Sequence, residues 1–224
     1  MNYFNLTLDT TSPSNAIISL EGGSQYASQQ LITATISTSD TPTTGYQMKI
    51  FGDVDTTYNA NIQANEETSS WITYNPSQQI KLSTVDGSKT VYLKIRDDVY
   101  NESAIVSDSI ILDTQVPIVT LTGADLTKIS KQTGKNVSSF SFSSDSDFVE
   151  YKVKVVGSSG AAHDTGTLIP TTNGSSNTSG TGTFTSASAI NVQINGADLE
   201  LASSGDGTKI IKVFVRENSN AWSV

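Results

Sequence analysis

Short runs in which apolar and polar residues alternate recur along the chain. Residues 91–95 alternate throughout, and residues 31–37 alternate toward their C-terminal end. A period of two places every second side chain on one face, which is typical of a strand in a sheet with one solvated face. Turn-forming pairs such as Gly22-Gly23 and Asp86-Gly87 separate the runs. The pattern therefore predicts short β-strands connected by turns.

The predicted strands occupy both halves of the chain. In the first half they are residues 16–20, 31–37, 46–51, 71–74, 80–82, 90–96 and 105–112. In the second half they are residues 118–121, 137–142, 148–156, 190–194 and 210–216. Residues 196–201 favour a short helical turn.

Residues 157–189 interrupt this rhythm in the second half. They are rich in Gly, Ser, Thr and Asn, and their bulky apolar residues are Leu168, Ile169 and Phe184. A connection of this length with so few apolar anchors is unusual inside a compact domain. We therefore expect an insertion, either an excursion on the sandwich or a mobile loop.

Two segments of the chain are repeated. Residues 6–13 match residues 110–117, where Leu-Asp-Thr is followed by proline, and residues 86–96 match residues 206–216. Each repeat holds strands enough for a sandwich of about 100 residues. We predict an all-β protein of two tandem immunoglobulin-like β-sandwich domains, residues 1–113 and 114–224. The second domain diverges, with the long Gly/Ser/Thr-rich insertion.

Composition then narrows the classes of partner. The net charge is −9 and the isoelectric point is about 4.4, so we expect no nucleic-acid partner, because phosphate binding needs a basic face. The absence of cysteine excludes disulfides and thiol chemistry, and the single histidine excludes sites that need two. No apolar run approaches the roughly 20 residues that span a bilayer, so no membrane partner is expected.

Few residues are candidates for catalysis. His163 follows Gly160-Ala161-Ala162 inside the insertion, and the chain has no G-x-S-x-G motif that would present a nucleophilic serine. The acidic pairs fall at predicted strand ends and turns, where solvated acids normally lie: Asp53 and Asp55, Asp97 and Asp98, Asp145 and Asp147. We expect no catalytic residue and no cofactor, and hence no enzyme.

Calcium is the one ion for which the sequence offers ligands. The turn after residue 96 is rich in oxygen donors of the kind that hard cations prefer: Asp97, Asp98, Asn101 and Glu102. Asp and Asn also stabilise turns by accepting hydrogen bonds from nearby backbone. Both interpretations stay open, with turn chemistry favoured.

The aromatic residues are interpreted mainly as core. Those beside alternating aliphatic residues are expected inside a sandwich: Trp71, Tyr74, Tyr92, Phe140, Phe142 and Trp222. Tyr46, Tyr58 and Tyr100 lie near turns and are the candidates for a surface that contacts a host glycan.

The repeated motifs resemble the bacterial and bacteriophage immunoglobulin-like repeat. The resemblance rests on LDTTSP at residues 8–13, DGSKTVYLKIRDDVYNES at residues 86–103 and SDSIILDT at residues 107–114. In that family a D-G-x-K strand, a turn with Asn and a last strand running into L-D-T-x-x-P end one domain. The second domain departs from the pattern, because the turn at residues 216–223 is followed only by Val224, which predicts a shortened final strand.

The start of the chain has the sequence of a closing strand. Residues 3–9 match residues 107–113, although no domain precedes them in this sequence. The segment either pairs inside its own domain or is donated to the open sheet edge of a neighbouring chain. The interface candidates are Tyr3, Phe4, Leu6, Leu8, Ile210, Val213, Val215 and Trp222.

The resemblance implies a fold and leaves the function open. We expect a non-enzymatic bacteriophage virion protein, in capsid decoration or in the tail, baseplate or fibre. Made in the host cytoplasm, it would bind other virion proteins in a homo- or hetero-oligomer and contact a host-surface glycan. The sequence starts with Met and shows no signal peptide, which favours this virion localisation. The alternatives are a cell-surface adhesin or stalk fragment and an accessory module of a secreted polysaccharide hydrolase.

Overall fold

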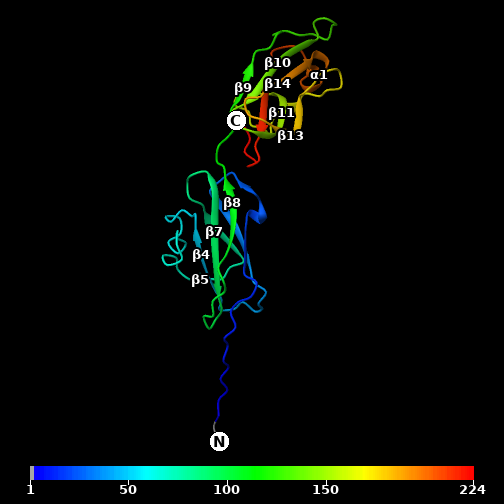
Figure 1. The fold of residues 1–224 in the computed structure, drawn as a ribbon. Coiled ribbons are helices and arrows are strands. Elements are labelled where there is room, and N and C mark those ends of the chain that lie inside the picture. The colour runs from blue at the N-terminus through cyan, green and yellow to red at the C-terminus, as the bar shows by residue number, and fades with distance from the viewer. Residues whose placement is uncertain (1–2) are drawn as a thin grey trace. The chain divides into compact units, whose positions relative to one another are not determined.

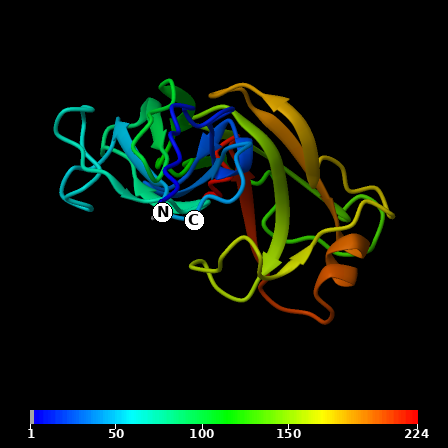
Figure 2. The ribbon, with the colours of Figure 1, turned by 90° about the horizontal axis from the view of Figure 1, so that it is seen from below.

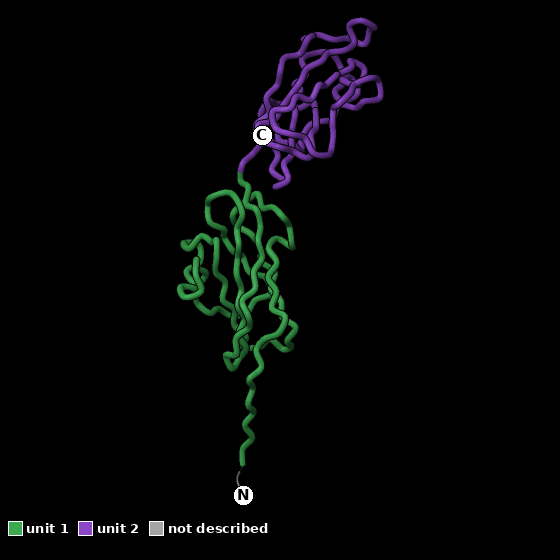
Figure 3. The backbone as a smooth tube through the Cα atoms, viewed as in Figure 1, with its two compact units in different colours: residues 1–114 green, residues 115–224 purple. Residues whose placement is uncertain are grey.

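The computed structural model describes residues 3–224 and resolves into two compact units. Unit 1 comprises Met1–Thr114 and unit 2 comprises Gln115–Val224 (Figure 3). The sequence boundary was set between residues 113 and 114, and the contacts within the structure divide the chain one residue later. Each unit has its own hydrophobic core.

Unit 1 contains eight strands and a single 3-10 turn at Glu21–Gly23 among the described residues. The strands are β1 (Ile17–Leu20), β2 (Tyr26–Ala27), β3 (Leu31–Ser37), β4 (Gln47–Gly52), β5 (Ile72–Thr73), β6 (Ser77–Lys81), β7 (Gly87–Arg96) and β8 (Val106–Leu112) (Figure 1). They form two sheets, β1-β3-β6 and β2-β8-β7-β4-β5.

Strand β8 completes the larger sheet of unit 1. It pairs antiparallel with β7, from Gly87 opposite Leu112 to Leu93 opposite Val106. The alternation of β8 turns Ile110 and Leu112 into the core, where both are essentially inaccessible to solvent. Strand β8 therefore closes the core between β7 and β1, which it also contacts.

Unit 2 also contains two sheets, but the strands at the edges of its sheets differ from those of unit 1. Its elements are β9 (Val119–Thr122), β10 (Val137–Ser144), β11 (Phe148–Val156), β12 (Thr167–Leu168), β13 (Ser179–Phe184), β14 (Ile190–Asn195), α1 (Gly196–Ala202) and β15 (Ile210–Arg216). One sheet has the order β14-β10-β9. In the other sheet, β12 and β13 pair with one side of β11, and β15 also pairs with β11. Helix α1 packs against β14 on the periphery of unit 2 (Figure 2).

The segment at residues 157–189 is built into the sandwich, so the expectation of a mobile loop is wrong. It supplies β12 and β13, and Ile169 is fully buried. Phe184 stacks on Phe148 at a ring-centroid distance of 4.9 Å, and Phe148 belongs to the aromatic core with Phe142 and Tyr151. Ile169 and Phe184 therefore anchor the segment to the core, while Leu168 is exposed.

The expected aromatic core is only partly confirmed. Phe142 is buried, and Tyr74 packs against the core of unit 1. Trp71 and Tyr92 lie instead on outer faces, where Trp71 is covered by the Arg96 guanidinium and Tyr92 stacks on Phe51. The prediction failed for these residues because cationic and aromatic neighbours can cover a large ring on a sheet surface as well as a core does.

The architecture is all-β, with two tandem β-sandwiches, as the sequence predicts. The last strand of unit 2 is shortened among the described residues, as predicted: Trp222 makes only an isolated bridge to Arg216.

Replacement of Ile169 by Ala tests whether residues 157–189 belong to the folded core. We expect Ile169→Ala to lower the free energy of unfolding of unit 2 by about 2–5 kcal/mol, because a buried aliphatic side chain is lost. The neighbouring Leu168→Ala is the control, since Leu168 is exposed, and should cost well under 1 kcal/mol. Calorimetric unfolding of both variants measures the difference; equal effects would contradict this packing.

Candidate functional site

The oxygen-rich turn after β7 is held by hydrogen bonds within the protein. The Asp97 carboxylate is buried and accepts from the backbone N–H groups of Val99 and Asn101, at 2.9 and 2.8 Å, and from the Asn101 side-chain amide. Glu102 pairs with Lys94 at 2.6 Å, which raises the pKa of Lys94. Asp98 lies at the surface of the same turn. Among residues 3–224 no group of three or more acidic or histidine side chains converges as metal ligands would.

A second buried acid, Asp198, was missed by sequence reasoning. It lies in the first turn of α1 and is inaccessible to solvent. Its carboxylate accepts from the backbone N–H groups of Asn173 and Ser175, both at 2.9 Å, and from the Thr172 hydroxyl. Burial alone would raise the pKa of Asp198, but these hydrogen bonds lower it to about 2. The available signal was an acid in the first turn of the predicted helical segment, where the helix dipole favours negative charge.

His163 serves a packing role in unit 2. Its ring stacks on Trp222 with centroids 4.7 Å apart and planes within 5°. Its backbone carbonyl accepts a hydrogen bond from the Lys154 ammonium at 2.7 Å. Trp222, an interface candidate, is therefore partly covered by His163 and by Lys152, which lies 4.6 Å from the ring centroid.

The surface tyrosines of unit 1 do not form an open platform. The Arg96 guanidinium lies 4.3 Å from the centroid of Trp71 and 4.2 Å from that of Tyr100, so it occupies one face of each ring. The Tyr46 hydroxyl donates to Asp40, and the pKa of Tyr46 is raised by burial and by that carboxylate. Tyr58 is exposed and lies apart in the loop between β4 and β5.

Unit 2 contains a groove of about 780 Å³ beside β15. Gly207 and Thr208, which line it just before β15 begins, are exposed. Its apolar lining includes Leu126, Ile129, Phe140, Leu199, Ile211 and Val213. Lys128 and Lys209 lie at the same groove, which gives an apolar floor with cationic groups beside it.

The sequence candidates fall into two groups relative to this groove. Val213 lines it and Val215 is fully buried further along β15, while Ile210 points to the opposite, solvated side. Tyr3, Phe4, Leu6 and Leu8 belong to the extended N-terminal segment, which belongs to no strand of the structure. Leu126 and Ile129 were not singled out, although two apolar residues within the polar stretch 123–136 were a usable signal.

The N-terminal segment is exposed along its length. It is drawn in blue, leaving the body of unit 1 (Figure 1). The side chains of Tyr3 and Phe4 are 85% exposed, and those of Leu6 and Leu8 are 86% exposed. Pairing of this segment inside its own domain is therefore not what the structure contains. Four large apolar side chains are thus exposed within one extended segment, which is unusual for a soluble surface.

Comparisons with known proteins give structural neighbours only. Neither a protein-family model nor a curated protein sequence matches the chain. The fibronectin(III)-like modules of Clostridium thermocellum CbhA align over 93% of this chain and 90% of theirs, with 10% identity and a TM-score of 0.47. The chitinase ChiA74 from Bacillus thuringiensis aligns over 93% of this chain, at 12% identity and a TM-score of 0.31. The chain spans 30% of the chitinase chain.

Asp198→Asn is expected to destabilise unit 2 by about 1–3 kcal/mol at pH 7, because hydrogen bonds to a buried charge are weakened. The folded-state pKa of about 2 lies below the ordinary 3.8, so the ionised group stabilises the fold above pH 4. That contribution is lost as pH falls from about 4 toward 2. Urea unfolding across this pH range should show the free energies of unfolding of the original chain and of Asp198→Asn converging. The control is Asp164→Asn, because Asp164 is exposed. A difference independent of pH would contradict the assignment.

Calcium is expected to leave the unfolding temperature of unit 1 unchanged. The Asp97 oxygens already accept hydrogen bonds, whereas a specific ion would stabilise the folded state by mass action. Calorimetry with millimolar CaCl₂ and with chelator checks this. A calcium-dependent rise that Asp97→Asn abolishes would reverse the interpretation.

Proposed function

We propose that the chain is a non-enzymatic pair of β-sandwich modules that works by binding other proteins, and that the groove beside β15 is a binding site. The observation that carries this is the apolar groove at an open sheet edge of unit 2. Its lining includes Ile211, which is only partly buried, although the matching position in unit 1, Val91, is fully covered. A partner strand laid along β15 would cover it.

The polar candidates support the same proposal, because each has a structural task. Asp97 holds a turn, Asp198 holds a loop, and His163 covers Trp222. The ligand that fits the groove is an extended peptide segment with apolar residues at every second position. Such a segment would supply backbone hydrogen bonds to β15 and side chains to the floor.

The proposed function is compatible with two settings. The first setting is the bacteriophage virion that is expected from the sequence, in which the module pair would bind other structural proteins. The second setting is an accessory module of a secreted polysaccharide hydrolase, or a fragment of a cell-surface adhesin or stalk. A sheet edge that binds an extended strand would serve in either setting.

Chemical cross-linking tests the proposal and distinguishes the virion setting from the bacterial-protein setting. An amine-reactive cross-linker applied to purified virions and to culture supernatant should join Lys128 and Lys209 to a partner polypeptide, because both lysines lie at the groove. Lys49 and Lys81 of unit 1 are the comparison lysines. Cross-links confined to unit 1, or turnover of a substrate that a single substitution abolishes, would contradict the proposal.

A further inference from the structure

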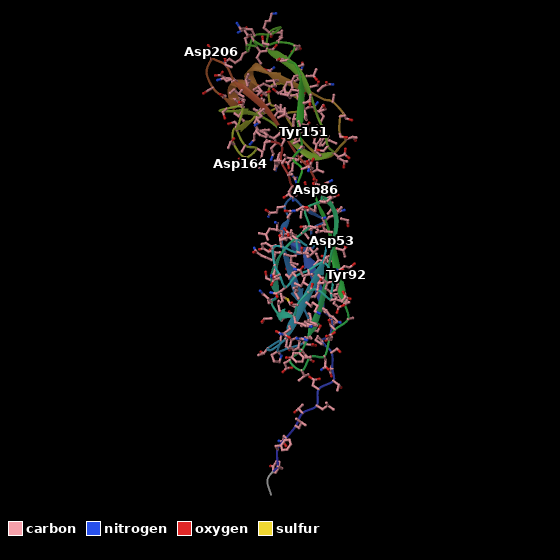
Figure 4. All side chains as sticks on the ribbon, turned by 90° about the vertical axis from the view of Figure 1, so that its left-hand side faces the viewer. Asp53, Asp86, Tyr92, Tyr151, Asp164 and Asp206 are labelled. Atoms are coloured by element: carbon pink, nitrogen blue, oxygen red, sulfur yellow. The ribbon has the colours of Figure 1, made fainter. Side chains whose placement is uncertain are left out.

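Unit 1 shows what a closed edge looks like in this protein. There β8 lies along β7 and turns Ile110 and Leu112 into the core. On the outer face, the Thr90 and Ser109 hydroxyls of the two strands are 3.0 Å apart. Just beyond the strand end, the Thr114 hydroxyl donates to Asp86 at 2.9 Å. The turn before β7, with Asp86, and the equivalent turn of unit 2, with Asp206, are labelled in Figure 4.

Unit 2 repeats the first contact of this closing strand, and among residues 3–224 no strand continues it along β15. In unit 1 the Ser103 N–H donates to the Ile95 carbonyl at 2.8 Å, and in unit 2 the Ser223 N–H donates to the Val215 carbonyl at 2.9 Å. Beyond this point the two units differ. Among residues 3–224, β11 is the one strand that pairs with β15. The groove lies where unit 1 holds β8, between β15 and β9.

The exposed N-terminal segment has the sequence of the strand that would fit there. Residues 6–10 (LTLDT) align with residues 110–114 (IILDT) of β8 and the residues that follow it. In this alignment Leu6 and Leu8 take the places of the inward-facing Ile110 and Leu112, and Phe4 extends the same face. Thr10 takes the place of Thr114, and Asp206 takes the place of Asp86.

We propose that residues 3–10 of one molecule are donated as the closing strand of unit 2 in a second copy of this chain. The register follows from that of β7 and β8: Leu6 lies opposite Lys209, Asn5 opposite Ile210 and Phe4 opposite Ile211. Phe4, Leu6 and Leu8 then enter the apolar groove, and the Thr10 hydroxyl donates to Asp206. This inference rests on the proposed function, since it names the partner.

The N-terminal segment leaves unit 1 at the end of β8 opposite to the end from which the chain continues into unit 2. The Asn101 side-chain amide, in the β7–β8 turn, donates to the Asp9 carbonyl at 3.3 Å. The chain departs toward unit 2 after Leu112, at the opposite end of β8. Residues 3–11 extend at most about 30 Å, and running back along the seven residues of β8 uses about 24 Å. Within unit 1 the segment therefore reaches little beyond the far end of β8, which favours a second copy as the donor.

Light scattering after size-exclusion chromatography tests the donation on the full chain. We expect concentration-dependent association that Phe4→Ser/Leu6→Ser/Leu8→Ser weakens roughly 100-fold or more, because three apolar side chains no longer leave water. Tyr3→Ser/Asn5→Ser/Thr7→Ser is the matched control, since these residues face outward in the proposed strand and should change association by only a few-fold. All six positions lie in the exposed segment, so neither variant should unfold unit 1.

Engineered disulfides test the register. Because the chain has no native cysteine, only the introduced cysteines can form a disulfide. Asn5→Cys in one molecule and Ile210→Cys in another should oxidise to a covalent dimer, because the equivalent Ser109 and Thr90 face each other across β8 and β7. Thr7→Cys with Lys212→Cys is the mismatched control, four residues out of register. Both pairs place cysteine on the outer face, away from the core.

Three results would overturn the proposal: a monomer at every concentration, equal oxidation of matched and mismatched pairs, or a disulfide formed within one Asn5→Cys/Ile210→Cys chain. Failure of the donation alone can be told apart from failure of the proposed function. If the purified chain stays monomeric while Lys128 and Lys209 cross-link to another polypeptide, the donor is not a second copy and the groove still binds protein.

Discussion

The structure depends on one constraint: the two apolar faces of a sandwich must be covered at every edge. Unit 1 meets it through β8, which places Ile110 and Leu112 over the core. Unit 2 meets it on the β11 side, where β12 and β13 pair along the strand, and leaves the β15 side with an apolar groove. Since apolar burial is the main force that holds such domains together, an uncovered edge lowers the stability of the domain.

The polar residues of the protein are arranged around the same constraint. Loops that cross the ends of the sheets carry backbone N–H groups that need acceptors, and buried carboxylates provide them. Asp97 accepts from the turn after β7, and Asp198 accepts from the loop before β13. These acids could be mistaken for reactive groups in the sequence, because the same ability to accept hydrogen bonds suits both purposes.

Sequence reasoning succeeded where a local pattern decides the structure. The alternation at residues 91–95 and 31–37 predicted β7 and β3, and the repeated Asp-Gly-x-Lys element predicted both β7 and β15. It failed for β12 and β13, because Ile169 and Phe184 are held by long-range packing that no local period reveals. The N-terminal segment has the sequence of a closing strand, but it belongs to no strand in the structure, because β8 already lies along β7 in unit 1.

The close contact at Gly180 has a consequence for how this protein can vary. A Cβ atom at that position would lie 2.5 Å from the Tyr151 ring, so even alanine would force the aromatic core of unit 2 to move. Within a stretch of small residues that looks permissive, the position of Gly180 is thus sterically restricted to glycine. Homologues should drift in the Ser and Thr around it while keeping glycine wherever an aromatic ring lies directly beneath the backbone.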